Sequence, residues 1–144
     1  MAYVMMHIKG EPKTMQSQTA YYSVIDEVKN YFEEGIRKLE RLNFKNIILD
    51  PGFGFAKTLE QNYELLAKMC QLESLSFPLL AGLSRKSMIF RALEIGPEEA
   101  LNGTTALNML ALQSGAKILR VHDAKEARET IKLFSLYKRG KKES

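Results

Sequence analysis

The stretch NIILDPGFGFAK, residues 46–57, decides the fold of this chain. It opens with a short, mostly apolar run, Asn46 to Leu49, and passes directly into a loop with one proline and two glycines. A nearly continuous apolar run of this length is typical of a strand that is covered on both faces, as in a parallel sheet. Asp50 stands at the carboxyl end of that run, where α/β folds place their binding residues. The stretch therefore predicts a buried strand with a candidate site at its end.

The same arrangement recurs along the chain. Three more short apolar runs are expected to form strands: Tyr3 to Ile8, Pro78 to Ala81 and Lys117 to Val121. Each of the four strands is followed by apolar residues three or four positions apart, a spacing typical of a helix that packs on one side. These patterns run from Val24 to Leu42, from Leu59 to Cys70 after a capping Thr58, from Leu101 to Ala111 with a stop at Gly115, and from Ala127 to Phe134. The order predicts an α/β fold of four consecutive βα units.

Four units leave two architectures open. A barrel of eight βα units needs roughly 200 residues or more, whereas this chain has 144. The units therefore form either a small open sheet or half of a barrel, whose two edge strands another chain or segment covers. The first apolar run begins almost at Met1 without a preceding turn, which is what a truncated chain is expected to show.

Composition and charge exclude several classes of protein. Hydrophobic residues make up 45% of the chain and charged residues 26%, which is typical of a globular domain. No apolar run approaches the roughly 20 residues of a membrane helix, and no secretory signal is evident, so we expect a cytoplasmic protein without a membrane partner. The basic excess lies mainly in residues 138–144, KRGKKES, which we expect to be a flexible tail after a domain of residues 1–137. A nucleic-acid partner is therefore not expected.

Cys70 is the single cysteine, so the chain cannot form an internal disulfide. It stands beside Leu66 and Met69 in a helical pattern, which predicts a buried, unreactive thiol. His7 lies between Met6 and Ile8 in the first strand, and it is open whether it is a core histidine or a functional one. His, Cys and carboxylate residues show no metal-ligand spacing, so no metal site is predicted in this chain.

The loop from Asp50 to Lys57 suits a flat heterocycle. The Asp50 carboxylate can accept hydrogen bonds from ring and amino N–H groups, and the phenylalanines of the loop can pack on a ring face. The alternative is a capping aspartate followed by an ordinary Gly/Pro turn.

Two further loops suit an anion. Residues 82–87, GLSRKS, join a strand to the start of a helix and bring a serine, two cations and backbone N–H groups together, although a charged surface turn is the alternative. In residues 120–123, RVHD, alternation places Arg120 and His122 on one face. Because the loops after the last strands of a βα barrel commonly bind phosphate, the two loops together predict a phosphate or pyrophosphate site.

Four groups of motifs make the chain resemble dihydropteroate synthase. They are MHIKG (6–10) followed by PKTMQ (12–16), DPGFGFAK (50–57), LLAGLSRKSMI (79–89) and GAKILRVHD (115–123). Their order and approximate spacing match that family from about Tyr3 to Phe134, but only over its second half. The resemblance therefore favours the half-barrel: residues 1–137 are expected to form the C-terminal half of a (βα)8 TIM-type barrel of the pterin-binding family.

The resemblance implies an activity and a set of site residues. The family condenses 6-hydroxymethyl-7,8-dihydropterin diphosphate with p-aminobenzoate to 7,8-dihydropteroate and pyrophosphate in folate biosynthesis, and it is the target of sulfonamides. The resemblance implies that Asp50 binds the pterin, that Gly82 lets the pterin approach the backbone closely, and that Lys86 contacts the pterin near the p-aminobenzoate site. Phe55 and Ser84 are implied in that second site. Arg120 and His122 are implied to hold the pyrophosphate, so that Lys86, Arg120 and His122 form the catalytic set.

By this resemblance, the chain lacks the N-terminal half of the family's proteins. That half supplies an Asn implicated in Mg²⁺ binding, further pterin-binding residues and two mobile loops, so the chain by itself is expected to be weak or inactive. Ile8 and Ala56 are conservative departures from the family pattern. Two alternatives remain: a non-catalytic, self-associating half-barrel that binds phosphate or pterin, and a pterin-dependent methyltransferase relative, against which the SRKS and RVHD motifs argue. A homo-oligomer, most simply a dimer, is expected because it would cover the open edges.

Overall fold

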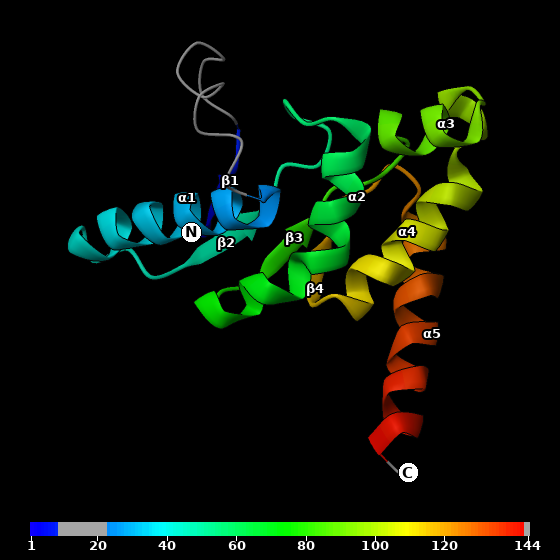
Figure 1. The fold of residues 1–144 in the computed structure, drawn as a ribbon. Coiled ribbons are helices and arrows are strands. Elements are labelled where there is room, and N and C mark those ends of the chain that lie inside the picture. The colour runs from blue at the N-terminus through cyan, green and yellow to red at the C-terminus, as the bar shows by residue number, and fades with distance from the viewer. Residues whose placement is uncertain (9–22, 143–144) are drawn as a thin grey trace.

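The computed structural model describes residues 1–8 and 23–142, and its strands alternate with helices (Figure 1). The motif residues 9–16 and the terminal residues 143–144 lie outside this description. The elements are β1 (Tyr3–Met6), α1 (Val24–Arg41), β2 (Ile47–Asp50), α2 (Leu59–Lys68), the 3-10 helix η2 (Met69–Leu75), β3 (Leu79–Ala81), α3 (Ser87–Leu93), the 3-10 helix η3 (Pro97–Glu99), α4 (Leu101–Gln113), β4 (Ala116–Leu119) and α5 (Ala124–Lys142).

The four strands form one parallel sheet in the order β1-β2-β3-β4. Each strand pairs with the next along the chain, for example Leu49 with Leu79 between β2 and β3. The prediction of four parallel strands that alternate with helices is confirmed. In the described part of the chain β1 and β4 are the edges of the sheet.

The two faces of the sheet differ in what covers them. Side chains on one face belong to the hydrophobic core that the helices share: Met5, Ile47, Leu49, Leu79, Ala81 and Ala116. Side chains that alternate with these are not part of that core: Val4, Ile48, Leu80 and Ile118. We call this second set the inner face. Val4 is 42% exposed, so the inner face is still partly open at its β1 edge.

Local sequence explains how α1 and α2 begin. The Ser23 side chain accepts the N–H of Asp26, and α1 then buries an apolar stripe from Val24 to Ile36 against the sheet. Thr58 caps α2 as predicted, in a capping box with Gln61 whose side chain accepts the N–H of Thr58. These two starts fix where each helix leaves the carboxyl end of the sheet.

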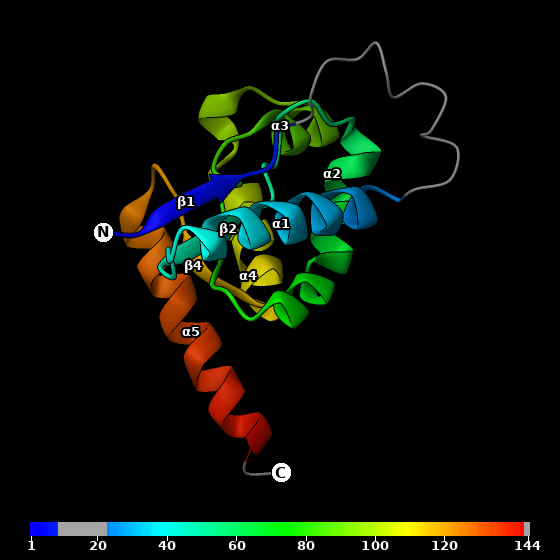
Figure 2. The ribbon, with the colours of Figure 1, turned by 90° about the vertical axis from the view of Figure 1, so that its left-hand side faces the viewer.

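Three sequence predictions need correction. The third crossover holds two α-helices, α3 and α4 with η3 between them, in place of one helix from Leu101 to Ala111. The helix α5 continues to Lys142, so residues 138–142 of the expected tail are helical and exposed, and α5 projects away from the sheet in both views (Figure 1, Figure 2). Cys70 is exposed, because the chain tightens from α2 into η2 and a turn of three residues no longer keeps the α-helical face.

Candidate functional site

Asp50 and Arg120 meet at the carboxyl ends of β2 and β4. Asp50 is only 1% exposed, and its Oδ1 accepts the N–H of Gly52 at 2.9 Å. Its Oδ2 lies 2.9 Å from Nη2 of Arg120, whose side chain is half exposed. This ion pair does not have the alignment of a hydrogen bond, so the buried Oδ2 keeps its capacity to accept one. A buried carboxylate with a free acceptor beside an exposed guanidinium is suited to a ligand that carries both N–H donors and negative charge.

The Arg120 guanidinium packs closely against Gly82. A Cβ atom at Gly82 would lie 2.8 Å from Nη2 and 3.3 Å from Cζ of Arg120. The guanidinium therefore packs against bare backbone, a place that only glycine leaves free. The resemblance implied that Gly82 allows the pterin to approach, whereas in this structure the group that approaches it is Arg120.

Lys86 reaches from the start of α3 into the loop after β2. Its Nζ donates to the carbonyl oxygen of Phe53 and lies 4.8 Å from the centre of the Phe55 ring. Burial lowers the pKa of Lys86 to about 8; the Asp50 carboxylate opposes this shift and Arg120 adds to it. The ammonium is therefore the main form at neutral pH, but it lies within reach of titration.

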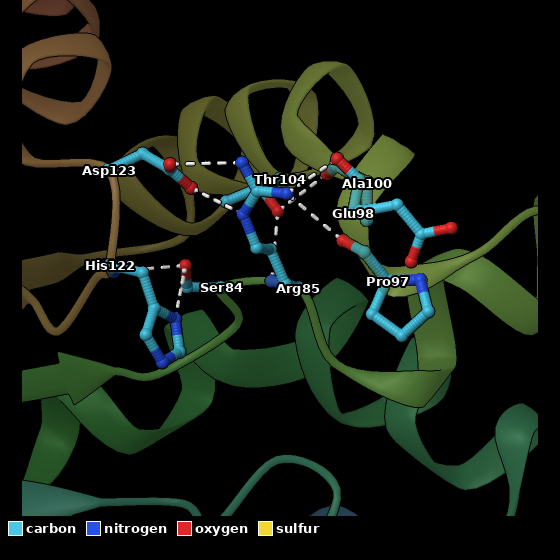
Figure 3. A network of polar contacts seen from close by, with 8 residues as sticks. All are labelled: Ser84, Arg85, Pro97, Glu98, Ala100, Thr104, His122 and Asp123. Carbon is cyan, nitrogen blue, oxygen red and sulfur yellow. Dashed lines mark hydrogen bonds and ion pairs between the residues drawn. The ribbon is translucent and has the colours of Figure 1, made fainter.

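Ser84 and His122 form a second contact between the loops (Figure 3). The buried Oγ of Ser84 accepts the backbone N–H of His122 at 3.1 Å and lies 3.0 Å from Nδ1 of its ring. When the hydroxyl donates to Nδ1, the ring proton of the neutral imidazole sits on Nε2. Ser84 thus fixes the orientation of the His122 ring.

Arg85 holds neighbouring segments together. The sequence predicted that both cations of the loop, Arg85 and Lys86, belong to the anion site, but the Arg85 side chain is bound to other parts of the protein. Its Nε and Nη2 donate to both oxygens of Asp123, at 2.9 and 3.0 Å, and its Nη1 donates to the carbonyl oxygens of Pro97 and Glu98 (Figure 3). Its own N–H donates to Thr104. The hydrogen bond from Arg85 holds the pKa of Asp123 below its usual range. Through its side chain and its backbone N–H, this one residue therefore ties together the loops after β3 and β4, η3 and the first turn of α4.

His7 is a buried contact between β1 and the loop after β2. It is 3% exposed, its Nδ1 lies 3.1 Å from Nζ of Lys57, and its Nε2 lies 3.6 Å from Glu27. Its backbone N–H donates to the carbonyl oxygen of Asp50 at 2.9 Å. These contacts favour the structural alternative for His7.

The three predicted loops converge. Asp50 meets Arg120, Phe53 and Phe55 meet Lys86, and Ser84 meets His122, so every pair of loops shares a contact. The sequence did not predict that Arg85 and Asp123 pair between two of these loops, or that Asn62 accepts a hydrogen bond from Gly54 in the third loop. Within residues 1–8 and 23–142, no three His, Cys, Asp or Glu residues are placed to hold a metal ion. In the same ranges no helix is long and apolar enough to cross a membrane.

Over residues 1–122 the sequence matches the family of pterin binding enzymes. The chain belongs to this family. Among its relatives, the dihydropteroate synthase of Escherichia coli K12 is 45% identical over 131 residues, which are 90% of this chain and 46% of the relative. The bifunctional dihydropteroate synthase/dihydropteroate reductase of Helicobacter pylori is 40% identical, over 91% of this chain and 34% of its own length. The resemblance drawn from the four motif groups is confirmed.

Solved structures place this chain in the same fold. The Yersinia pestis dihydropteroate synthase in its sulfonamide drug complex superimposes with a TM-score of 0.87 at 35% identity, covering 96% of this chain and 52% of that one. The Thermus thermophilus dihydropteroate synthase gives a TM-score of 0.83 at 35% identity, covering 94% and 55%. The chain spans about half the length of the relatives that it matches. The half-barrel prediction is therefore confirmed.

Proposed function

We propose that this chain carries the C-terminal half of a dihydropteroate synthase site, which joins 6-hydroxymethyl-7,8-dihydropterin diphosphate to p-aminobenzoate. The observation that carries the proposal is the meeting of Asp50, Arg120 and Lys86: a buried carboxylate with a free Oδ2 lies beside two cations. The Oδ2 atom, which accepts no hydrogen bond in the structure, suits an N–H group of the pterin, and the Arg120 guanidinium suits the diphosphate. The Phe55 ring lies 4.8 Å from Nζ of Lys86 and Ser84 contacts His122, and we propose that p-aminobenzoate, or a sulfonamide in its place, binds beside these residues.

The proposed reaction is a substitution at the methylene carbon of the pterin. The amine nitrogen of p-aminobenzoate forms the new C–N bond, the C–O bond to the diphosphate breaks with its electron pair leaving on oxygen, and the amine proton passes to solvent. Negative charge grows on the leaving oxygen, which Arg120 and the Nε2–H of His122 can stabilise. The Lys86 ammonium and the Asp50 carboxylate hold the pterin end, so that only the methylene group moves toward the attacking amine.

Mg²⁺ is implied by the family, but the described residues of this chain do not fit it. They bring no set of three carboxylate, His or Cys side chains together, so no step of the proposed reaction runs through a metal ligand of this chain. We propose that any protein ligand for Mg²⁺ comes from the half of the barrel that these residues do not include. The single cysteine and the folate substrates support the further proposal of a cytoplasmic location.

Turnover of labelled p-aminobenzoate by the purified 144-residue chain tests the function. With the pterin diphosphate and Mg²⁺, we expect turnover that is absent or orders of magnitude below that of a full-length relative, because half of the site is lacking. We expect the chain to bind the pterin diphosphate nonetheless, in isothermal titration calorimetry. A chain that folds but binds neither the pterin diphosphate nor pyrophosphate would contradict the proposed function.

The Gly82→Ala substitution is expected to weaken binding of the pterin diphosphate about tenfold. The new Cβ would lie 2.8 Å from Nη2 of Arg120, so the guanidinium must shift away from residue 82, and we expect this shift to weaken its pairing with Asp50. One charged hydrogen bond contributes about 1.5–3 kcal/mol, and about 1.4 kcal/mol is a factor of ten in affinity. Calorimetry checks this against Gly140→Ala, where a Cβ meets nothing within 4 Å. Equal affinities for the two variants would contradict the role of Gly82.

Binding of the pterin diphosphate is also expected to weaken as pH rises through about 8. Burial lowers the pKa of Lys86 from 10.5 to about 8. In the ligand-free site Lys86 therefore loses its proton and its positive charge at a pH where an ordinary lysine is still charged. Calorimetric titrations from pH 7 to 9.5 measure the effect, and Lys86→Met supplies the baseline because the diphosphate itself titrates. The same shift predicts that the free energy of unfolding rises between pH 8 and 10.5, because only the unfolded chain binds the proton there. A wild-type pH profile parallel to that of Lys86→Met would contradict this prediction.

We propose a second copy of the chain as the partner that covers the open edges. The inner face (Val4, Ile48, Leu80 and Ile118) lies outside the core, and two four-stranded halves have the strand number of a closed barrel. Light scattering after gel filtration should give twice the mass of one chain, and Val4→Lys should lower the measured mass. Leu42→Lys changes an exposed residue at the end of α1 and should leave the measured mass unchanged. A monomer at all concentrations would overturn this pairing.

A further inference from the structure

Asn62 is a buried polar residue that ties one loop of the site together. It lies in the first turns of α2 and is 2% exposed. Its Oδ1 accepts the N–H of Gly54 at 2.8 Å, and its Nδ2 donates to the carbonyl oxygen of Thr58 at 2.8 Å. A longer contact of 3.5 Å reaches the carbonyl oxygen of Lys57. These polar contacts are directed into the loop that joins β2 to α2, so the side chain fixes the middle of that loop against its end.

The part of the loop that Asn62 holds is the part that encloses Lys86. Phe53 contributes the carbonyl oxygen that accepts from Nζ, and Phe55 contributes the ring 4.8 Å from Nζ. Gly54 lies between them, and a Cβ atom there would come within 3.1 Å of Cδ of Lys86. Three consecutive residues therefore surround the lysine stem and ammonium. The central one, in a left-handed conformation with φ of +80°, is held by Asn62.

We propose that Asn62 is a positioning residue that fixes the Lys86 ammonium in the site through the backbone of residues 53–55. It acts indirectly, because its side-chain hydrogen bonds are with the backbone of the loop and not with the charged groups of the site. The inference rests on the proposed role of Lys86, yet the placement of the ammonium can be measured without any substrate. The amide also supplies what an apolar residue at this position could not, since the Gly54 N–H would lose its acceptor.

The titration of Lys86 reports whether the loop encloses it. Burial is the main cause that brings the pKa of Lys86 down to about 8. The charged groups that face it are Asp50 at the end of β2 and Arg120 after β4, and neither is changed when Asn62 is replaced. Release of residues 53–55 would let water reach the ammonium, which favours the charged form. A change at Asn62 is therefore expected to raise the pKa of Lys86 toward 10.5, the ordinary value.

Nuclear magnetic resonance of the full chain with ¹³Cε-labelled lysine tests the proposal, with the Lys86 signal identified by its loss in Lys86→Met. In Asn62→Ala we expect the titration midpoint of Lys86 to move from about 8 toward 10.5. Leu65→Ala is the matched control, because Leu65 is fully buried in the same helix and belongs to the core. This control should destabilise the fold at least as much and leave the midpoint at about 8.

Two results would overturn the proposal: a folded Asn62→Ala chain in which Lys86 still titrates near 8, and an equal shift in Leu65→Ala. If Asn62→Ala does not fold, Gly54→Ala tests the same enclosure, because its Cβ presses on Cδ of Lys86. An unchanged midpoint there also overturns the proposal. The predicted midpoint shift together with no binding of pterin diphosphate by the wild-type chain would remove the proposed function and leave the positioning role in place.

Discussion

Replacement of Arg120 by alanine is expected to weaken binding of the pterin diphosphate about a hundredfold and to destabilise the fold in the same step. The guanidinium is half exposed and can offer a diphosphate several charged donors, each of which contributes about 1.5–3 kcal/mol. Its loss also leaves the Asp50 carboxylate, 1% exposed, without the cation 2.9 Å away. Breaking a buried pair costs about 3–5 kcal/mol, and because water reaches this arginine we expect about 2 kcal/mol here.

A double-mutant cycle with Asp50→Asn separates the two effects. Asparagine carries no charge, so the Arg120→Ala change in the Asp50→Asn background should cost much less of the free energy of unfolding. Binding of the pterin diphosphate should stay lost in the double variant, because both ligand contacts are gone. Urea unfolding and calorimetry measure the two quantities, with Lys38→Ala as the control at an exposed cation that pairs with Glu34. Additive stability effects of Asp50→Asn and Arg120→Ala would show that the two side chains are not coupled.

The residues of this pair were predictable from sequence because they stand at strand ends. Asp50 ends β2 and Arg120 follows β4, and parallel strands in one sheet bring their carboxyl ends to the same edge. The short apolar runs also predicted the four strands, with bounds that differ from the observed ones by at most two residues. These predictions were possible because they depend only on the order of the strands and helices and on the alternation of side chains along a strand.

The role of Arg85 could not be predicted in this way. As a sequence, SRKS presents two adjacent cations at a helix start, and nothing local distinguishes the arginine from the lysine. The structure separates them because Arg85 has a φ of +52° and its partners, Pro97, Glu98 and Asp123, lie 12 to 38 residues away. Their proximity depends on how α3, η3 and α4 pack, and hydrophobic spacing does not encode that packing.

Cys70 and Asn62 show how local geometry defeats a pattern. The spacing of Leu66, Met69 and Cys70 predicted one continuous buried stripe, but η2 replaces α-helix at Met69, so Met69 is buried and Cys70 turns outward. Asn62 stands where a helix normally carries solvated residues. It is buried because the preceding loop folds back over the start of α2 and offers the N–H of Gly54.

The substitution Gly52→Ala is expected to have the largest effect on the fold. Gly52 has a φ of +73°, and a Cβ atom there would lie 2.0 Å from the carbonyl oxygen of His7. The neighbouring backbone cannot easily give way, because His7 donates to the Asp50 carbonyl and the Gly52 N–H donates to Oδ1 of Asp50, both at 2.9 Å. The carbonyl of Gly52 is held as well, by Nζ of Lys57 at 2.9 Å. A clash with backbone in a left-handed conformation is expected to cost about 3–5 kcal/mol.

Thermal unfolding followed by circular dichroism checks this result against Gly140→Ala. The control places a methyl group where nothing lies within 4 Å, inside α5, and should be neutral or stabilise the helix by up to about 1 kcal/mol. Because the clash lies where β1 meets the loop that begins at Asp50, the Gly52 variant should also lose binding of the pterin diphosphate in proportion to the folded fraction lost. A Gly52→Ala chain as stable as the Gly140→Ala chain would mean that β1 and this loop are not held together as the structure shows, and the enclosure of Asp50 would then need another cause.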